Sequence, residues 1–339
     1  MPGLSGHRDA WAEGSDCTSG PCPLYYARSI DGGASFSAAT LLTGVSDFAM
    51  RRQIARSGQV VAVVWTDAAS AQVFARVSSD GGSTFGTAKV LGKTTNTGRS
   101  GNLGSDGFAS VAVGQGVIYA TYHSKGQPGK AATLKLRRST NNGASWLSAI
   151  TVSKATDGVD PATLSASGKN AVIVYAHRLN ASLDALAVRR TTNKGASWKA
   201  EQRGFSASNL SSSNPVSTVN GTKWSVAFAR CSNTDCDMVD IYLTQSTNAG
   251  KTWSTPSLVQ SADATHSLLV PYGIAYSSKL AIMYWKSDWA FSDYDCWVVA
   301  GSGRLLQGNA TSRRPYRPAA LVGPVDELAA RRLNKTKQM

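Results

Sequence analysis

Short apolar stretches separated by turn-forming residues run along most of the chain. In the clearest segment they fall at 53–56, 60–65, 72–77 and 87–91, with Gly, Ser and Asp common in the gaps. Short runs rich in Val and bounded by Gly and Ser are typical of β strands. Connections this short join antiparallel neighbours. The pattern therefore predicts a unit of four short antiparallel strands.

A turn phrase recurs between the third and fourth strands of these units. It has the form Ser/Thr-x-Asp/Asn-x-Gly-x-Ser/Thr-Phe/Trp, and its copies begin at residues 29, 78, 139, 191 and 246. The spacing of 49 to 61 residues between copies indicates a solenoid or a propeller. Four antiparallel strands per repeat favour the blades of a β-propeller.

Two further units carry only part of the pattern. One near the N-terminus lacks its first strand, and the last has the strands but no turn phrase. We therefore predict an all-β fold, a six-bladed β-propeller of four-stranded antiparallel blades whose first blade lacks its innermost strand. The natural chain is expected to begin upstream of this one. The predicted propeller spans 1–303, with blades at 1–44, 51–93, 107–154, 160–206, 214–261 and 271–303.

The turn phrase itself predicts a structural role. Asp or Asn at its third position suits a turn because the side chain accepts backbone N–H groups two residues on. The Gly two residues after it adopts a positive φ without steric cost. The closing aromatic residue is expected to bury its ring between sheets. A catalytic acid or calcium ligand would not exchange its charge so freely. The third positions are Asp31, Asp80, Asn141, Asn193 and Asn248.

The phrase resembles the Asp-box, or bacterial neuraminidase repeat, of the sialidase-like propeller superfamily. Five copies at blade spacing cover most of residues 7–300. In that superfamily Asp-boxes lie on the face opposite the active site. The resemblance therefore implies that any binding or chemistry occurs where first strands begin and second strands end. Residues predicted there are Glu13, Arg51, Arg52, Asp67, His177, Arg178, Arg230 and Tyr272.

Sialidases grip the substrate carboxylate with three arginines and use an Asp acid/base and a Tyr nucleophile activated by Glu. By resemblance, Arg52 or Arg51 stands for the first arginine, Asp67 for the acid/base and Tyr272 for the nucleophile. A tyrosine has a pKa near 10 and needs such a base. Glu13 is the only glutamate at the expected face. The candidates for the remaining substrate contacts are His177, Arg178 and Arg230.

Cysteine spacing points to disulfides. Cys17–Cys22 and Cys231–Cys236 are both C-x4-C pairs after a strand-like segment, and each pair is expected to close a short loop as a disulfide. Disulfides indicate an oxidising, extracellular or cell-surface location. A four-thiolate zinc site is the rival interpretation, but this spacing is a weak metal signature. We therefore predict no metal and no cofactor.

Charge completes the functional hypotheses. The formal net charge is +14, and the segment 304–339 forms a basic tail in which a short helix is expected. Positive charge favours anionic partners, and no nucleic-acid motif or membrane-spanning run is present. We predict a secreted, sialidase-like propeller that binds an acidic glycan or cell-surface ligand without the full catalytic set. The alternatives are an exo-α-sialidase and an interaction scaffold that uses the basic tail.

Overall fold

The computed structural model describes most of the chain between residues 8 and 315. The described residues are 8–12, 21–31, 33–44, 49–67, 69–94, 109–124, 133–153, 159–180, 183–203, 210–276, 280–287, 294–301 and 314–315. All regular elements among them are β strands. None of these residues belongs to a helix long and apolar enough to cross a membrane.

Three groups of strands each form a separate four-stranded antiparallel sheet. The first is β4 (Ala49–Ser57), β5 (Val60–Asp67), β6 (Gln72–Ser78) and β7 (Lys89–Lys93). The second is β8 (Ser110–Gly114), β9 (Val117–His123), β10 (Leu134–Ser139) and β11 (Ile150–Thr151). The third is β12 (Val159–Ser167), β13 (Asn170–Asn180), β14 (Leu183–Thr191) and β15 (Gln202–Arg203).

The ends of the chain depart from this scheme. The first sheet has three strands: β1 (Arg8–Ala12), β2 (Leu24–Arg28) and β3 (Thr40–Leu41). The next group is β16 (Ser212–Asn220), β17 (Lys223–Cys231), β18 (Val239–Ser246) and β19 (Ser257–Gln260). The last is β20 (Leu268–Tyr276), β21 (Leu280–Ser287), β22 (Tyr294–Gly301) and β23 (Arg314–Pro315). A parallel bridge between Val239 and Leu268 joins these two groups into one sheet, so the described strands show neither six separate blades nor a closed ring.

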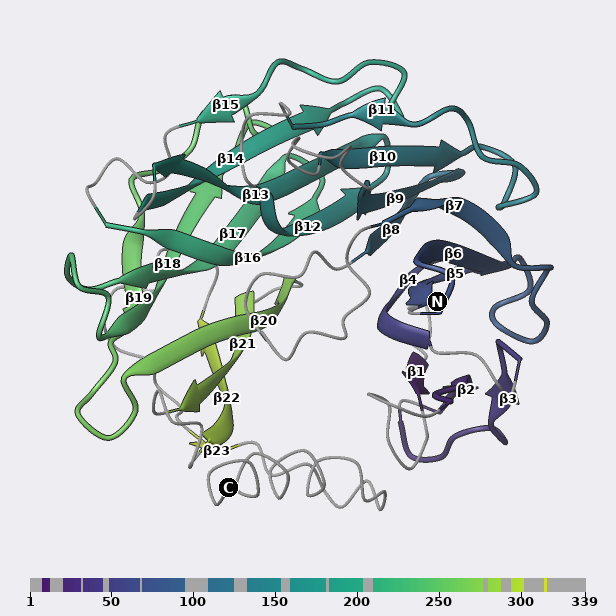
Figure 1. Cartoon of the computed structure of the whole chain (residues 1–339), viewed down its shortest axis with the longest axis horizontal. Coiled ribbons are helices and arrows are strands. Elements are labelled where there is room, and N and C mark those ends of the chain that lie inside the picture. The colour runs from purple at the N-terminus through teal and green to yellow at the C-terminus, as the bar shows by residue number, and fades with distance from the viewer. Residues whose placement is uncertain are drawn as a thin grey trace.

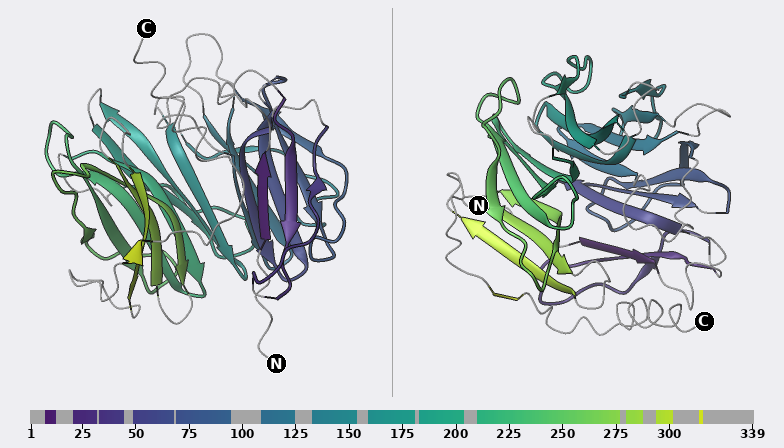
Figure 2. Two further views of the ribbon diagram at one scale, coloured as in Figure 1. Left: turned by 90° about the horizontal axis from the view of Figure 1, so that it is seen from below. Right: turned by 60° about the vertical axis from the view of Figure 1, so that its left-hand side comes forward.

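The sheets are arranged around a common centre, as in a propeller (Figure 1). The strands β4, β8, β12, β16 and β20, called the inner strands below, contact one another in sequence around this centre. Each group of four strands therefore turns its first strand inward and its last strand outward, as the oblique views also show (Figure 2).

The hydrophobic core lies between neighbouring sheets. One cluster, for example, packs Val64 of β5 against Val111 of β8 and Tyr122 of β9. Side chains of a strand alternate between its two faces. A sheet packed on both sides must therefore be apolar on both faces, which explains why β9 is buried at every position.

The five turn phrases adopt one geometry. The side-chain oxygen of the Asp or Asn accepts the N–H of the residue four positions later, at 2.9–3.1 Å. The preceding Ser or Thr hydroxyl accepts the N–H of the Gly, at 2.8–3.1 Å. The acceptor role is as predicted, but the donor lies four residues on rather than two. These turns are structural.

Asp and Asn are interchangeable at the third position because the hydroxyl group four residues later can rotate to suit either side chain. Thr84 donates its hydroxyl proton to Asp80, whereas Asn141 donates an amide proton to the hydroxyl of Ser145. A hydroxyl serves as donor or acceptor, so either residue completes the turn. The Thr84 hydroxyl, followed by other hydrogen bonds to the carboxylate, lowers the pKa of Asp80 below its usual value.

The closing aromatics pack as predicted in four of the five turns. Phe85, Trp146, Trp198 and Trp253 pack against core clusters. Phe36, in the first turn, is 45% exposed. Phe36 is therefore more exposed than the closing aromatic residues of the other four turns.

Candidate functional site

Four of the five inner strands contain a β-bulge near their first residues. The pairing register shifts between Met50 and Gln53, between Val159 and Ala162, between Ser213 and Val216, and between Pro271 and Gly273. Bulges twist a strand and redirect side chains, and they are over-represented beside functional sites. Because every inner strand starts at the same end of its sheet, the bulges mark one face of the molecule. This face, where inner strands begin and second strands end, is called the mouth.

The sequence explains where the bulges form. Pro161 and Pro215 lie inside two of them, and proline cannot donate a hydrogen bond to the strand ladder. Asn214 beside Pro215 has φ +47°, a left-handed conformation that Asn tolerates better than most residues. The prolines that head these repeats thus interrupt the ladder at the mouth.

The bulges carry three residues that the sequence singled out. Arg51 and Arg52 together oppose Trp65 in the second strand, and Tyr272 is the extra residue of the β20 bulge. The Arg52 side chain is exposed, and Tyr272 is 47% exposed despite its place in an inner strand. Both side chains are therefore accessible to a ligand.

Second strands contribute residues at the same level. Asp67, His177 and Arg230 pair directly with the first residue of their inner strands, which are Ala49, Val159 and Ser212. Arg178 follows His177 in β13. The structure therefore places the backbone of each of these predicted residues at the mouth.

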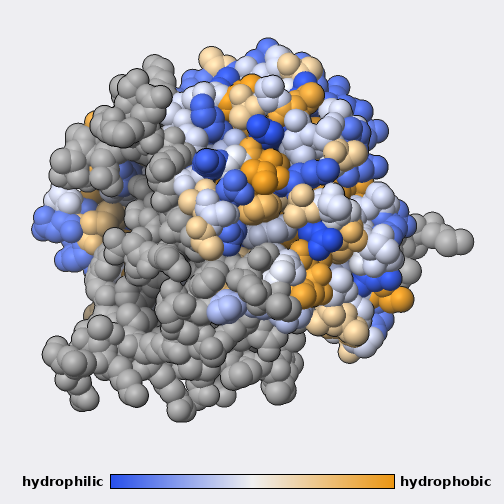
Figure 3. Space-filling view, turned by 45° about the vertical axis from the view of Figure 1, so that its right-hand side comes forward, coloured by the Kyte–Doolittle hydropathy of each residue, from blue (hydrophilic) through white to orange (hydrophobic). Residues whose placement is uncertain are grey.

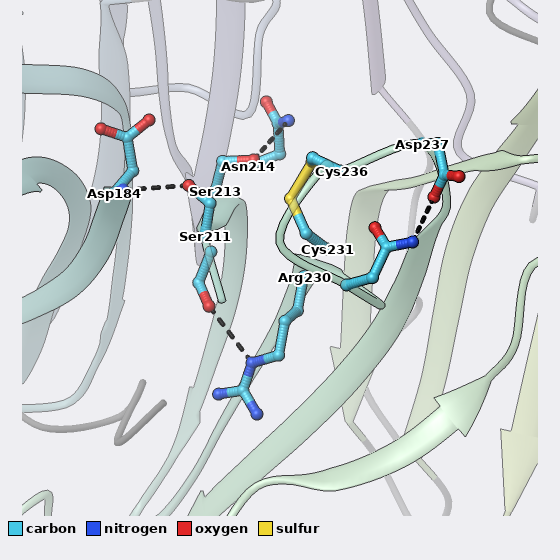
Figure 4. The surroundings of a disulfide bond; sticks show 10 residues. Asp184, Ser211, Ser213, Asn214, Arg230, Cys231, Cys236 and Asp237 are labelled. Carbon is cyan, nitrogen blue, oxygen red and sulfur yellow. Dashed lines mark hydrogen bonds between the residues drawn. A yellow bond between two sulfur atoms is a disulfide. The ribbon is translucent and has the colours of Figure 1, made fainter. Parts of the chain in front are cut away.

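Arg230 occupies the seam between the third sheet and β16–β18 and is only 9% exposed (Figure 4). Its Nε donates to Ser212 Oγ at 3.2 Å. Its Cζ lies 4.5 Å from the ring centre of Tyr242 and 5.1 Å from that of Phe228, which stack on each other. Burial lowers the pKa of Arg230, but an arginine stays protonated in proteins. The seam thus holds a fixed positive charge against the stacked rings of Phe228 and Tyr242, which are called the aromatic shelf below.

Asp67 is engaged in a local turn. Its carboxylate accepts the N–H of Ser70 at 2.8 Å and the Ser70 hydroxyl, and the N–H of Ala69 lies 3.4 Å away. These contacts fit a strand-end cap.

Glu201 lies just before the outer strand β15. Its carboxylate accepts the Tyr175 hydroxyl and pairs with Arg203.

The predicted catalytic set is only partly within the described residues. Glu13 lies outside them, as do the side chains of Arg51, His177 and Arg178. Convergence of three arginines with Asp67 and Tyr272 therefore stays a prediction. No group of three or more His, Cys, Asp or Glu side chains suited to a metal ion occurs in the part of the chain that the structure describes.

A disulfide closes the loop beside Arg230, as the sequence predicted. Cys231 and Cys236 are bonded, with their Cα atoms 4.7 Å apart. Asn233 Nδ2 donates to Asp237 at 2.6 Å inside the same loop (Figure 4). Cys22 is buried and disulfide-bonded, while its predicted partner, Cys17, lies outside the described residues.

The seam between β18 and β20 holds a charged cluster that sequence reasoning missed. Asp263 lies 3.6 Å from Lys286 Nζ and 3.4 Å from His266 Nδ1, and it accepts the N–H of Thr265 and of His266. Burial acts to raise the pKa of Asp263, but the His266 N–H bond, Lys286 and the other contacts outweigh it and lower the pKa. The carboxylate is therefore used locally. Lys286 lies near the end of a second strand, as Arg230 does. This equivalent position in the repeat could have identified Lys286 from the sequence.

No protein-family model matches the chain, and no curated protein matches it. Among solved structures, a PL25 polysaccharide lyase, an ulvan lyase, aligns over 88% of this chain and 77% of its own, with TM-score 0.59 and 12% identity. A PL25 ulvan lyase bound to -[GlcA(1-4)Rha3S]- aligns over the same shares at TM-score 0.58 and 12% identity. A protein of unknown function from Dyadobacter fermentans DSM 18053 aligns over 84% of this chain and 87% of its own, with TM-score 0.54 and 12% identity. At these identities the likeness supports a propeller-like all-β fold.

Proposed function

We propose that this protein is an extracellular six-bladed propeller of the sialidase-like superfamily that binds an acidic glycan at its mouth. The observation that carries the proposal is the set of bulges at the start of the inner strands, which leaves Arg52 and Tyr272 accessible on one face. An arginine pairs with a carboxylate or sulfate group, and an aromatic ring stacks on the apolar face of a sugar.

Two further observations support an anionic ligand. Arg230 adds a buried positive charge to a second-strand end at the mouth. One similar solved structure holds a repeat that contains glucuronate and a sulfated rhamnose. The disulfide between Cys231 and Cys236 supports an extracellular location, because such bonds persist in oxidising compartments.

Titration calorimetry with a hyaluronan hexasaccharide tests this proposal. Loss of one charge-assisted hydrogen bond weakens binding by roughly tenfold, so we expect that effect in Arg52→Gln. Tyr272→Ala removes the stacking surface and is expected to weaken binding as well. Arg56→Gln is the matched control, because Arg56 lies at the opposite end of β4 and donates to Gly58. Equal losses in Arg52→Gln and Arg56→Gln would contradict a site at the mouth.

Exo-α-sialidase activity is the second candidate, favoured by the exposed phenol of Tyr272 in the last inner strand. It requires Tyr272 to act as nucleophile with a carboxylate base. Turnover of a fluorogenic sialoside that disappears in Tyr272→Phe supports hydrolysis. Binding of the hexasaccharide without sialoside turnover leaves the glycan-binding function alone.

A further inference from the structure

Positive charge is concentrated on the outer strands of the second and third sheets, at the end opposite the mouth. The only carboxylates in 133–153 and 183–203 are Asp184, at the mouth end of β14, and Glu201, which Arg203 and Tyr175 engage. Apart from Arg203 and from Lys135, which lies near the mouth end of β10, the basic residues of these two segments are Arg137, Arg138, Arg189, Arg190, Lys194 and Lys199. This surface is called the basic wall.

A cavity of about 440 Å³ opens in the basic wall between the two sheets. Volumes of this size are common for small-ligand sites. It lies far along the blades from the mouth, beside the turn phrase that begins at residue 191. Its lining includes Arg138, Leu147, Ser148, Ile150, Arg189 and Trp198.

Backbone carbonyls hold both arginines in place. Arg138 Nη1 donates to Lys194 O at 2.9 Å, across the seam between sheets. Arg189 donates from Nε to Lys199 O at 3.2 Å and from Nη1 to Thr151 O at 3.1 Å. A guanidinium has five N–H donors, so each retains donors for a ligand. Neither forms an ion pair with a described carboxylate.

The remaining lining is apolar and partly exposed. Leu147 and Ile150 line the cavity, and their side chains are 46% and 42% exposed. Trp198 packs edge-on against Tyr119, and its buried Nε1 has no hydrogen-bond partner among the described residues. A side view shows hydrophobic residues exposed among strongly hydrophilic ones on the described outer surface (Figure 3).

Arginines occupy these two positions of the repeat at more than one seam, but not at every seam. In the preceding turn phrase, Arg137 stands where Arg189 stands, four residues before the Asn. One phrase earlier, the position of Arg138 is taken by Val77, which is buried. The seam between the first and second four-stranded sheets therefore lacks the second guanidinium. The seam between the N-terminal sheet and the first four-stranded sheet does have the pair, because Arg28 donates to Gly81 O at 3.3 Å and Arg76 donates to Gly86 O at 2.7 Å. The pair is therefore a repeated contact between sheets, and the Arg138–Arg189 seam combines it with a cavity whose apolar lining is partly exposed.

We propose that this cavity is a second binding site, which takes a carboxylate- or sulfate-bearing sugar unit of an acidic polysaccharide. The two guanidinium groups pair with the anionic substituents, and the apolar side chains contact the sugar ring. Charge complementarity selects this occupant. Single-stranded nucleic acid instead requires several aromatic stacking platforms along a groove, whereas this cavity offers one tryptophan that already packs on Tyr119.

Ser148→Glu tests the site without disturbing the arginine contacts. Ser148 is exposed and lines the cavity, so the substitution places a negative charge beside the two guanidinium groups. Thr87→Glu is the matched control, because Thr87 is exposed and occupies the same place after its turn phrase. One added repulsive charge near a bound anion weakens binding by about fivefold.

The measurement is amide hydrogen exchange of the full chain with a chondroitin sulfate hexasaccharide, at low and at elevated salt. We expect protection of peptides covering 134–151 and 189–199, lost in Ser148→Glu and retained in Thr87→Glu and in the mouth variant Arg52→Gln. Protection confined to mouth peptides overturns the second site and leaves the proposed function intact. Equal loss in Thr87→Glu also overturns it. Tighter protection of the same peptides by a single-stranded decanucleotide overturns the sugar assignment.

Discussion

Replacing Gly82 by alanine tests whether the turn phrase fastens one sheet to the next. Gly82 has φ +85°, and a Cβ added there would lie 1.9 Å from Tyr26 Oη and 2.7 Å from Tyr26 Cζ. Tyr26 belongs to the neighbouring sheet, is 1% exposed and packs edge-on against Phe85. The added methyl therefore collides with a buried ring that has little room to move.

Two effects add in this variant. A left-handed conformation costs an alanine about 1–2 kcal/mol, and overpacking a well-filled core costs about 1–3 kcal/mol. We expect Gly82→Ala to lower the free energy of unfolding by roughly 3 kcal/mol. Gly58→Ala is the control, because Gly58 has φ +58° and nothing lies within 4 Å of the place that its added methyl would take. In Gly58→Ala the free energy of unfolding is expected to fall only by the cost of the left-handed conformation, about 1 kcal/mol.

Urea unfolding of both variants, followed by tryptophan fluorescence, measures the difference. Adding Tyr26→Phe to Gly82→Ala removes Oη but leaves the ring carbon at 2.7 Å, so only part of the loss is expected to return. If Gly82→Ala is no more destabilising than Gly58→Ala, the close packing between the turn and the neighbouring sheet is refuted. A full recovery in the double variant would show that the ring shifts freely, contrary to its burial.

Three further predictions concern the disulfide, acid stability and the aromatic shelf. Cys231→Ser with Cys236→Ser removes a short cross-link and should lower the free energy of unfolding by about 2 kcal/mol; thiol titration of the wild type should find both cysteines unreactive until a reductant is added. Because the pKa of Asp80 is lowered in the fold, its contribution is present above about pH 4 and is lost as the pH falls below it. Asp80→Asn should therefore reduce the acid sensitivity of the urea midpoint between about pH 5 and pH 2.5, and an unchanged acid sensitivity would contradict this reasoning. Arg230→Gln loses the stacking on Tyr242 and should destabilise by about 1–2 kcal/mol, a loss that Arg230→Lys recovers only in part.

Strand positions were accessible from the sequence because they depend on local alternation. The ranges 60–65 and 72–77 fall inside β5 and β6, and the range 53–56 falls inside the longer β4. The strand predicted at 87–91 lies two residues later, at Lys89–Lys93. Turn residues and burial on both faces left few alternatives for these segments.

The mouth was predictable in location but not in geometry. Strand ends named Asp67, Arg230 and Tyr272 as neighbours of the same face, and their register agrees. A bulge depends on which residue of the partner strand is opposite, and that pairing is a long-range property. Hence the exposure of Tyr272 in an inner strand, and the use of Asp67 as a turn cap, emerged only from the fold.

The sequence by itself determined the repeat, the turn chemistry and the all-β class, because each follows from hydrogen bonding and side-chain periodicity within a few residues. Tertiary structure alone decided which side chains meet across seams. Arg230 reaches Ser212 and its aromatic shelf, and Arg138 reaches the carbonyl of Lys194, only because neighbouring strands and sheets pack side by side. These contacts join residues far apart in the chain, and local sequence preferences carry no information about such distances.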